Sequence, residues 1–133
     1  MSDDLLLRVP FVGRTGAQLR ERRAGYSEIA LEVTPDHCDS FGRLHGGIAT
    51  TLMDSALAIA LRELRGEGAG FHASIEMNAS FLAHAEPGEA VVIEARILRV
   101  DEGLVAFGQA ELLRVSNREL LATARVTFGI QSA

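Results

Sequence analysis

The segment from residue 46 to residue 61 limits what this chain can fold into more than any other stretch, because it is apolar or small almost throughout. It starts with a Gly-Gly pair, and Arg62, Glu63 and Arg65 mark its return to solvent before the glycines between 66 and 70. Such a segment predicts a helix, and a helix without a polar face must be enclosed on most of its sides. The rest of the chain therefore has to cover it.

Alternation of apolar and polar residues predicts about six strands outside this helix. The expected strands cover residues 16–23, 26–34, 74–81, 91–97, 104–114 and 120–130. In the strand at 74–81, the alternation places Ile75, Met77, Ala79 and Phe81 on one face and Ser74 on the other. Short turns join consecutive strands and so make antiparallel pairs. One antiparallel sheet wrapped around one long central helix satisfies both patterns. This α+β arrangement is the hotdog fold, although periodicity also permits other α+β sandwiches.

Length and composition exclude several classes of function. The 133 residues suit a single domain, expected to span residues 1–133. The formal net charge of −5 argues against nucleic acid as the partner, because phosphate backbones select basic surfaces. The most apolar segment contains Asp54, so no stretch is clean enough to span a membrane. A lone Cys38 and the lack of a signal-peptide core fit a reducing cytoplasm. No spacing of His, Cys, Asp and Glu suggests a metal site.

Asp54 is the only formally charged residue between Arg43 and Arg62, and it falls in the middle of the predicted helix. A carboxylate among apolar side chains loses hydration, which is costly unless it is paired or faces a cleft. An aspartate on a solvated helix edge is the simpler interpretation, but the neighbouring turns, with Met53 and Ala56, offer no polar face. Lost hydration raises the basicity of a carboxylate. Asp54 is therefore the candidate general base or nucleophile.

His45, Gly46 and Gly47 stand where the helix begins. The first N–H groups of a helix have no partner within it, and they point toward any negative charge placed there. Glycine leaves this surface open to close approach. A Gly-Gly pair alone is more often a flexible entry to a helix. Together with the preceding histidine and the following lone aspartate, it predicts an oxyanion hole for a carbonyl group that becomes tetrahedral.

The chain resembles the hotdog-fold acyl-CoA thioesterases of the phenylacetic-acid-degradation (PaaI-like) type. Their signature, His-Gly-Gly followed by a carboxylate nine positions after the histidine, matches the stretch from His45 to Asp54. The similarity extends over roughly residues 12–130 and includes the strand from Ser74 to Asn78. The resemblance implies hydrolysis of an acyl-CoA thioester without a metal or other cofactor. It also implies homodimers that usually pair into homotetramers.

The same resemblance implies a role for each matching residue. Asp54 would activate water or attack the thioester directly, and the Gly46 N–H would bind the oxyanion. His45 would help to shape the thioester site, and Ser74 would help to hold the water. Gly47 and Asn78 lie in the matching segments and are expected to contact the substrate.

Asp39 departs from the family pattern, because many relatives have an asparagine six positions before the histidine. An ionised aspartate only accepts hydrogen bonds, so it cannot donate to a thioester oxygen as an amide can. Asp39, still expected among the substrate-binding residues, is then protonated, or has another role, or the donor is missing. The family's arginine after Phe-Leu is also absent, which leaves Arg99, Arg114 and Arg118 as candidates for the CoA phosphates by exclusion.

The remaining histidines, His37, His72 and His84, are expected to be polar surface residues. Two other functions stay open. A hotdog hydratase or dehydratase would pair a histidine directly with its acid, and His45 and Asp54 are badly placed for that within one chain. A non-catalytic acyl-CoA binding module would have the same fold without turnover.

Helical geometry predicts that one chain does not complete the site alone. His45 and Asp54 are nine residues apart, which at about 100° per residue places them on opposite faces of the helix. Gly46 and Asp54 are closer in angle but still roughly 12 Å apart along the axis. Two antiparallel helices that meet across a two-fold interface bring the start of each helix near the middle of the other. We therefore expect two shared sites per dimer, each with Gly46 of one chain and Asp54 of the other.

Overall fold

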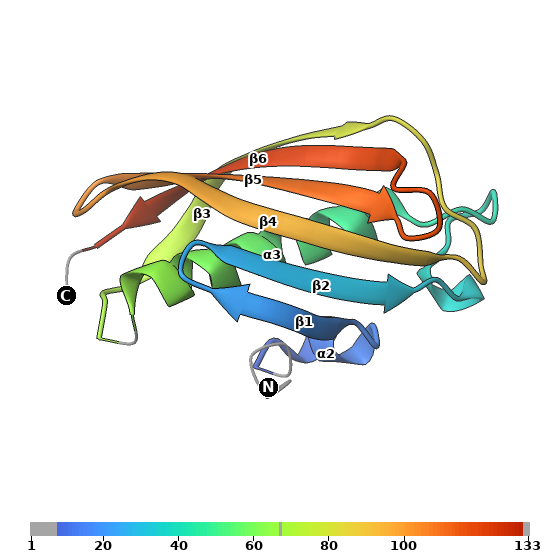
Figure 1. Ribbon diagram of the computed structural model, residues 1–133, viewed down its shortest axis with the longest axis horizontal. Coiled ribbons are helices and arrows are strands. Elements are labelled where there is room, and N and C mark those ends of the chain that lie inside the picture. The colour runs from blue at the N-terminus through green and yellow to red at the C-terminus, as the bar shows by residue number, and fades with distance from the viewer. Residues whose placement is uncertain (1–7, 67, 132–133) are drawn as a thin grey trace.

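Six antiparallel strands form one curved sheet that lies against a single long helix (Figure 1). The computed structural model describes residues 8–66 and 68–131. In chain order the elements are α2 (Pro10–Arg14), β1 (Gln18–Arg23), β2 (Tyr26–Glu32), η1 (Pro35–His37), α3 (Gly46–Arg65), β3 (His72–Phe81), β4 (Ala90–Asp101), β5 (Val105–Arg114) and β6 (Leu120–Ile130). The predicted architecture of one long helix and about six strands is confirmed. The short helices α2 and η1 are additions that the periodicity does not predict.

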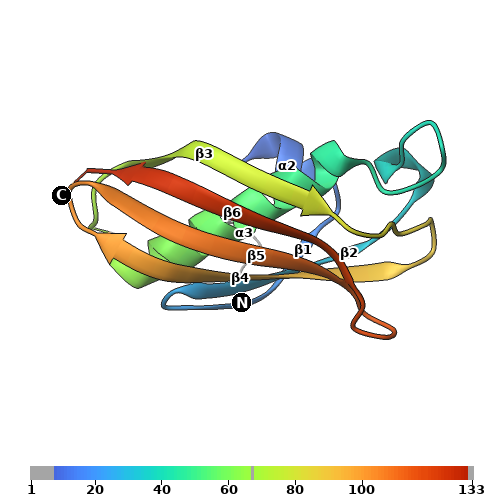
Figure 2. The same ribbon diagram turned by 90° about the horizontal axis from the view of Figure 1, so that it is seen from above.

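The strands lie in the order β1-β2-β4-β5-β6-β3, so β1 and β3 form the two edges of the sheet. Seen from above, α3 runs diagonally across the strands, and β3 lies along one margin (Figure 2). The helix packs mainly against β2, β4 and β5. Within residues 8–66 and 68–131, no helix is both long and apolar enough to cross a membrane.

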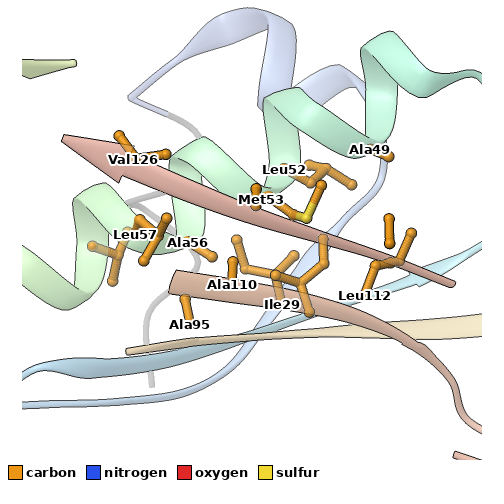
Figure 3. Close-up of a cluster of buried hydrophobic side chains, with 14 of the residues drawn as sticks. Ile29, Ala49, Leu52, Met53, Ala56, Leu57, Ala95, Ala110, Leu112 and Val126 are labelled. Carbon is orange, nitrogen blue, oxygen red and sulfur yellow. The ribbon is translucent and has the colours of Figure 1, made fainter. Parts of the chain in front are cut away.

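The face of α3 that meets the sheet carries large apolar side chains, whereas β5 opposite it carries small ones. Met53 and Leu57 are fully buried, and Ala110 of β5 lies in the same cluster (Figure 3). Gly108 makes a close approach possible, because a Cβ atom there would lie 2.7 Å from Cδ2 of Leu57. Full burial of a leucine or methionine side chain contributes about 1.5–3 kcal/mol. The small residues of β5 therefore let the helix lie deep enough to bury its apolar face.

Polar contacts fix the helix on the sheet. The buried Ser27 hydroxyl of β2 donates to the Ala56 carbonyl at 2.6 Å, and the Gly25 N–H donates to the Ala60 carbonyl at 3.2 Å.

Arg65 ties the end of the helix to two other segments, because its guanidinium binds Glu102 and donates to the carbonyls of Gly70 and Gln131. Its side chain is only 2% exposed. The expectation that Arg65 marks a return to solvent is therefore wrong: the hairpin after β4 supplies a carboxylate that the local sequence does not reveal.

The side of α3 that faces away from the sheet is only partly covered. Thr51, Asp54, Ser55 and Ala58 are half-buried there, and α2 contributes the buried Val12. A single chain therefore encloses the helix less completely than its apolar sequence predicts.

We expect Gly108→Ala to lower the free energy of unfolding by about 1–3 kcal/mol, the usual range for overpacking a core. The added methyl group would meet the side chain of Leu57, which is fully buried. Gly129→Ala on the neighbouring strand is a matched control, since its nearest neighbour, Ile75, is 64% exposed and free to shift. Urea unfolding of the three proteins measures the difference. Equal stability of both variants would contradict the close packing of α3 on β5.

Candidate active site

Asp54 lines a cavity of about 370 Å³ on the side of α3 that faces away from the sheet. The carboxylate is half-buried, and its Oδ1 accepts a hydrogen bond from the Ser74 hydroxyl of β3 at 2.7 Å. The apolar walls of the cavity include Val12 of α2 and Ala58 of α3. Asp54 thus faces a cleft, as a carboxylate in an apolar helix must if it is not buried in an ion pair.

A β-bulge in β3 brings Ser74 to this carboxylate. Residues paired across neighbouring strands point to the same face of a sheet. Ser74 pairs with Phe128 and Met77 pairs with Val126, and both partners on β6 point into the core. The register shifts between Ser74 and Glu76, so Ser74 shares the inner face with Met77, although residues three positions apart in a regular strand point to opposite faces. The predicted alternation is therefore wrong at this point, and Ile75 is 64% exposed instead of facing the core.

Helix α3 begins with one free N–H group. His45 is the N-cap, and its Nδ1 accepts the Gly47 N–H at 2.8 Å. The N–H groups of Ile48 and Ala49 both donate to the His45 carbonyl. Among the described residues, the Gly46 N–H has no acceptor. It is therefore the first-turn donor that remains open to a ligand, and the helix dipole favours a negative charge there.

Steric constraints explain why both residues after His45 are glycines. A Cβ atom at Gly47 would lie 2.9 Å from Nδ1 of His45, so a side chain there would break the cap. A Cβ atom at Gly46 would lie 3.2 Å from the ring of Phe81. Because Nδ1 of His45 accepts a hydrogen bond, the neutral ring carries its proton on Nε2. His45 thus both caps the helix and presents an N–H group at its exposed edge.

Asp39 organises the loop that precedes the helix. Its Oδ1 accepts the backbone N–H groups of Phe41 at 2.8 Å and of Arg43 at 3.2 Å. The N–H groups of Arg43 and Phe41 hold the pKa of Asp39 below its ordinary value. Of the three explanations for this departure from the family pattern, the geometry favours another role, that of an ionised carboxylate that closes the loop.

The other expected substrate contacts are not all brought to Asp54. Asn78 pairs with Arg125 and lies on the outer face of the sheet, away from the Asp54 of its own chain. Arg99, Arg114 and Arg118 each bind a carboxylate, namely Asp101, Glu89 and Glu94. None of the three lines the cavity that holds Asp54.

Two of the three other histidines do not lie on the surface as expected. His37 is buried: its Nδ1 accepts the Thr34 N–H, and its Nε2 lies 2.7 Å from the Thr15 carbonyl. It therefore links the loop to the segment after α2. His72 is half-buried and lines the same cavity as Asp54. His84 is exposed, in agreement with the prediction.

The cavity also contains two cations that sequence reasoning does not single out, Arg8 and Arg62. Arg62 lies about two turns after Asp54 on the helix, so its spacing could have indicated that the two residues share one side of α3.

Within one chain, Gly46 and Asp54 remain eight residues apart on α3, roughly 12 Å along the axis. Among residues 8–66 and 68–131, no group of three or more His, Cys, Asp or Glu side chains is arranged to hold a metal ion.

The comparison with protein families gives a match to the thioesterase superfamily over residues 41–110. The chain is 34% identical to acyl-coenzyme A thioesterase 13 of Mus musculus over 97 residues, which cover 73% of this chain and 67% of that protein. The match of residues 41–110 includes α3 and its entry, where His45, Gly46 and Asp54 lie.

Two solved structures show the same fold. Zebra fish thioesterase superfamily member 2 superposes with a TM-score of 0.79 at 28% identity, covering 86% of this chain and 80% of that one. A variant of the phenylacetic acid degradation protein PaaI from Thermus thermophilus gives 0.81 at 25% identity, covering 91% and 98%. The predicted hotdog fold and the family resemblance are both confirmed. The chain belongs to the thioesterase superfamily.

Proposed function

We propose that this protein hydrolyses an acyl-CoA thioester to the free acid and CoA. The observation that carries the proposal is the half-buried Asp54 carboxylate, which lines a cavity with partly apolar walls and accepts a hydrogen bond from the Ser74 hydroxyl. The name of the mouse relative, an acyl-coenzyme A thioesterase, supports CoA as the carrier of the acyl group.

The chemistry requires one base or nucleophile and one oxyanion donor. Asp54 either takes a proton from water as the water attacks the thioester carbon, or attacks that carbon itself to form an anhydride that water then cleaves. In both routes the C–S bond breaks, and the departing CoA sulfur takes up a proton. The carbonyl oxygen gains negative charge on the way, and an open helix N–H such as that of Gly46 stabilises it. The hydrogen bond from Ser74 orients the carboxylate.

We further propose that two copies of the chain share each site. Gly46 and Asp54 are too far apart along α3 to act on one carbon atom, as the helical rise requires. Strand β3 supports an edge-to-edge dimer, because it is a long edge strand on which Ile75 is 64% exposed and residues 73–76 are exposed throughout. An open apolar edge is a template for pairing with another chain. A second copy there would also cover the half-buried side of α3.

Pairing of two such dimers into a tetramer is the arrangement that the family resemblance implies. The outer face of the sheet offers a surface for it, since Leu98 and Phe107 are 52% and 38% exposed there.

Replacement of Asp54 by asparagine should lower kcat by at least about 100-fold, the effect of removing a general base. The amide keeps the shape of the side chain and still accepts the Ser74 hydrogen bond, so the protein should remain folded. Release of free CoA from a panel of acyl-CoA thioesters, followed with a thiol reagent, measures the effect. Glu63→Gln is the matched control, because Glu63 is on the same helix but pairs with Arg22 outside the cavity. Near-normal turnover by folded Asp54→Asn would refute the assignment. Binding without turnover by the unmodified protein would indicate a binding module.

Asp39→Asn is expected to retain or improve kcat/KM. The asparagine oxygen can accept the same two backbone N–H groups, so the loop keeps its geometry, and the new amide N–H₂ adds a donor for a thioester oxygen or water. The same CoA-release assay, run over a range of substrate concentrations, measures the change. Loss of hydrolysis would mean that Asp39 works as a carboxylate in the reaction.

Mixed dimers test the shared site. Gly46→Val blocks the oxyanion donor and Asp54→Ala removes the carboxylate, so each variant alone should be inactive. If they are folded together, one site of each mixed dimer carries both lesions and the other carries none. Activity should therefore return, at up to half of the normal value per mixed dimer. Mass spectrometry of the intact complex shows whether mixed dimers form. A mixture that contains them and stays inactive would exclude the shared site.

A further inference from the structure

The cavity that Asp54 lines has more basic than acidic residues in its walls. The exposed Arg8 and the half-buried Arg62 line it together with Asp54, so two cationic residues share the cavity with one carboxylate. Among the described residues, neither arginine has an acidic group within ion-pair distance. A half-buried cation without a partner is costly, because burial removes hydration and nothing replaces it.

Arg62 differs in this respect from the basic residues near it. Arg65, three residues later, is held by Glu102 and two carbonyl groups. Arg22, on β1 beside the end of the helix, is paired with Glu63 at 3.1 Å. Arg22 and Arg65 thus have ion-pair partners, whereas Arg62, which lines the cavity, has none among the described residues.

The position of Arg62 relative to Asp54 follows from the helix. Eight residues turn through about 800°, two full turns and about 80°, and rise about 12 Å. Asp54, Ala58 and Arg62 therefore follow one side of α3, and all three line the cavity. The wall between the carboxylate and the guanidinium is apolar, formed by Ala58, Ile59 and Val12. Such a wall suits an alkyl or aryl chain better than the amides of the CoA arm.

His72 adds a neutral hydrogen-bonding group at the same end. It lines the cavity and also a second hollow of about 270 Å³ together with Arg62, so both residues stand where the two spaces adjoin. Its ring packs edge-on against Phe128. Burial, with the nearby Arg65 and Arg62, holds the pKa of His72 below its ordinary value, so the ring is neutral at pH 7.

We propose that this end of the cavity selects acyl groups that carry a carboxylate at their distal end, with Arg62 as the binding group and His72 as a second donor. The inference rests on the proposed thioesterase function and adds the substrate class. The thioester carbon lies at Asp54, the chain follows the apolar wall, and the distal carboxylate pairs with the Arg62 guanidinium. Arginine suits this role because its planar fork binds a carboxylate through two parallel hydrogen bonds.

Adipyl-CoA and hexanoyl-CoA test the proposal, since they have the same chain length and differ by the distal carboxylate. The unmodified protein should show a kcat/KM about tenfold higher for adipyl-CoA, as expected for a charge-assisted hydrogen bond. Arg62→Gln should lower this ratio about tenfold. Arg14→Gln should leave the ratio unchanged, because Arg14 is an exposed arginine on α2 that does not line the cavity. An equal loss on both substrates would place Arg62 at the CoA phosphates and overturn the proposal, as would a preference for hexanoyl-CoA.

Binding measurements separate this inference from the proposed reaction. Titration calorimetry with the Asp54→Ala protein should show tighter binding of adipyl-CoA than of hexanoyl-CoA, and an added Arg62→Gln change should remove the difference. This readout does not require turnover. Hydrolysis of hexanoyl-CoA together with equal binding of both thioesters would leave the thioesterase function standing and refute the distal carboxylate site alone.

Discussion

Close packing of α3 against the small residues of β5 determines the arrangement of the rest of the molecule. Gly108 allows Leu57 to approach the strand, and Ser27 and Gly25 then bond to carbonyl groups of the helix. These contacts fix both the depth and the rotation of the helix. One side of α3 thereby faces the core, and the side with Asp54 faces the cavity. A helix free to rotate would bury that carboxylate against apolar side chains, at a cost of several kcal/mol.

The strands could be predicted because each buries one face and so shows an alternating pattern, and the helix because its long apolar segment is flanked by glycines and charged residues. The phase of β3 could not, since the bulge between Ser74 and Glu76 is set by the pairing with β6 and not by a distinctive residue. The burial of the His37 and Arg65 side chains could not be predicted from the sequence either. Their partners, the Thr15 carbonyl and Glu102, lie far away in the chain.

The residues of the candidate site also fall into two groups, those that local sequence predicts and those that only the fold reveals. His45, Gly46 and Asp54 could be chosen from a single helix and its cap, where spacing and chemistry are both local. The role of Asp39 needed the loop geometry, because the residue type alone does not say which N–H groups it accepts. The cations of the cavity needed the fold, since α2 supplies Arg8 and the end of α3 supplies Arg62. Sequence thus points to the candidate reacting groups more readily than to the residues that line the cavity around them.

The bulge in β3 has a consequence for how such a protein can change. Before it, even-numbered residues such as His72 and Ser74 face the helix; after it, odd-numbered residues such as Met77 do. The strand therefore has two parts in series, one that contacts the Asp54 carboxylate and one that packs into the core. A substitution of Ser74 therefore acts on the surroundings of Asp54, whereas a substitution of Met77 acts on the packing of the core. Loss of the single residue Ile75, the extra residue of the bulge, would restore regular pairing and still leave Ser74 and Met77 on the inner face.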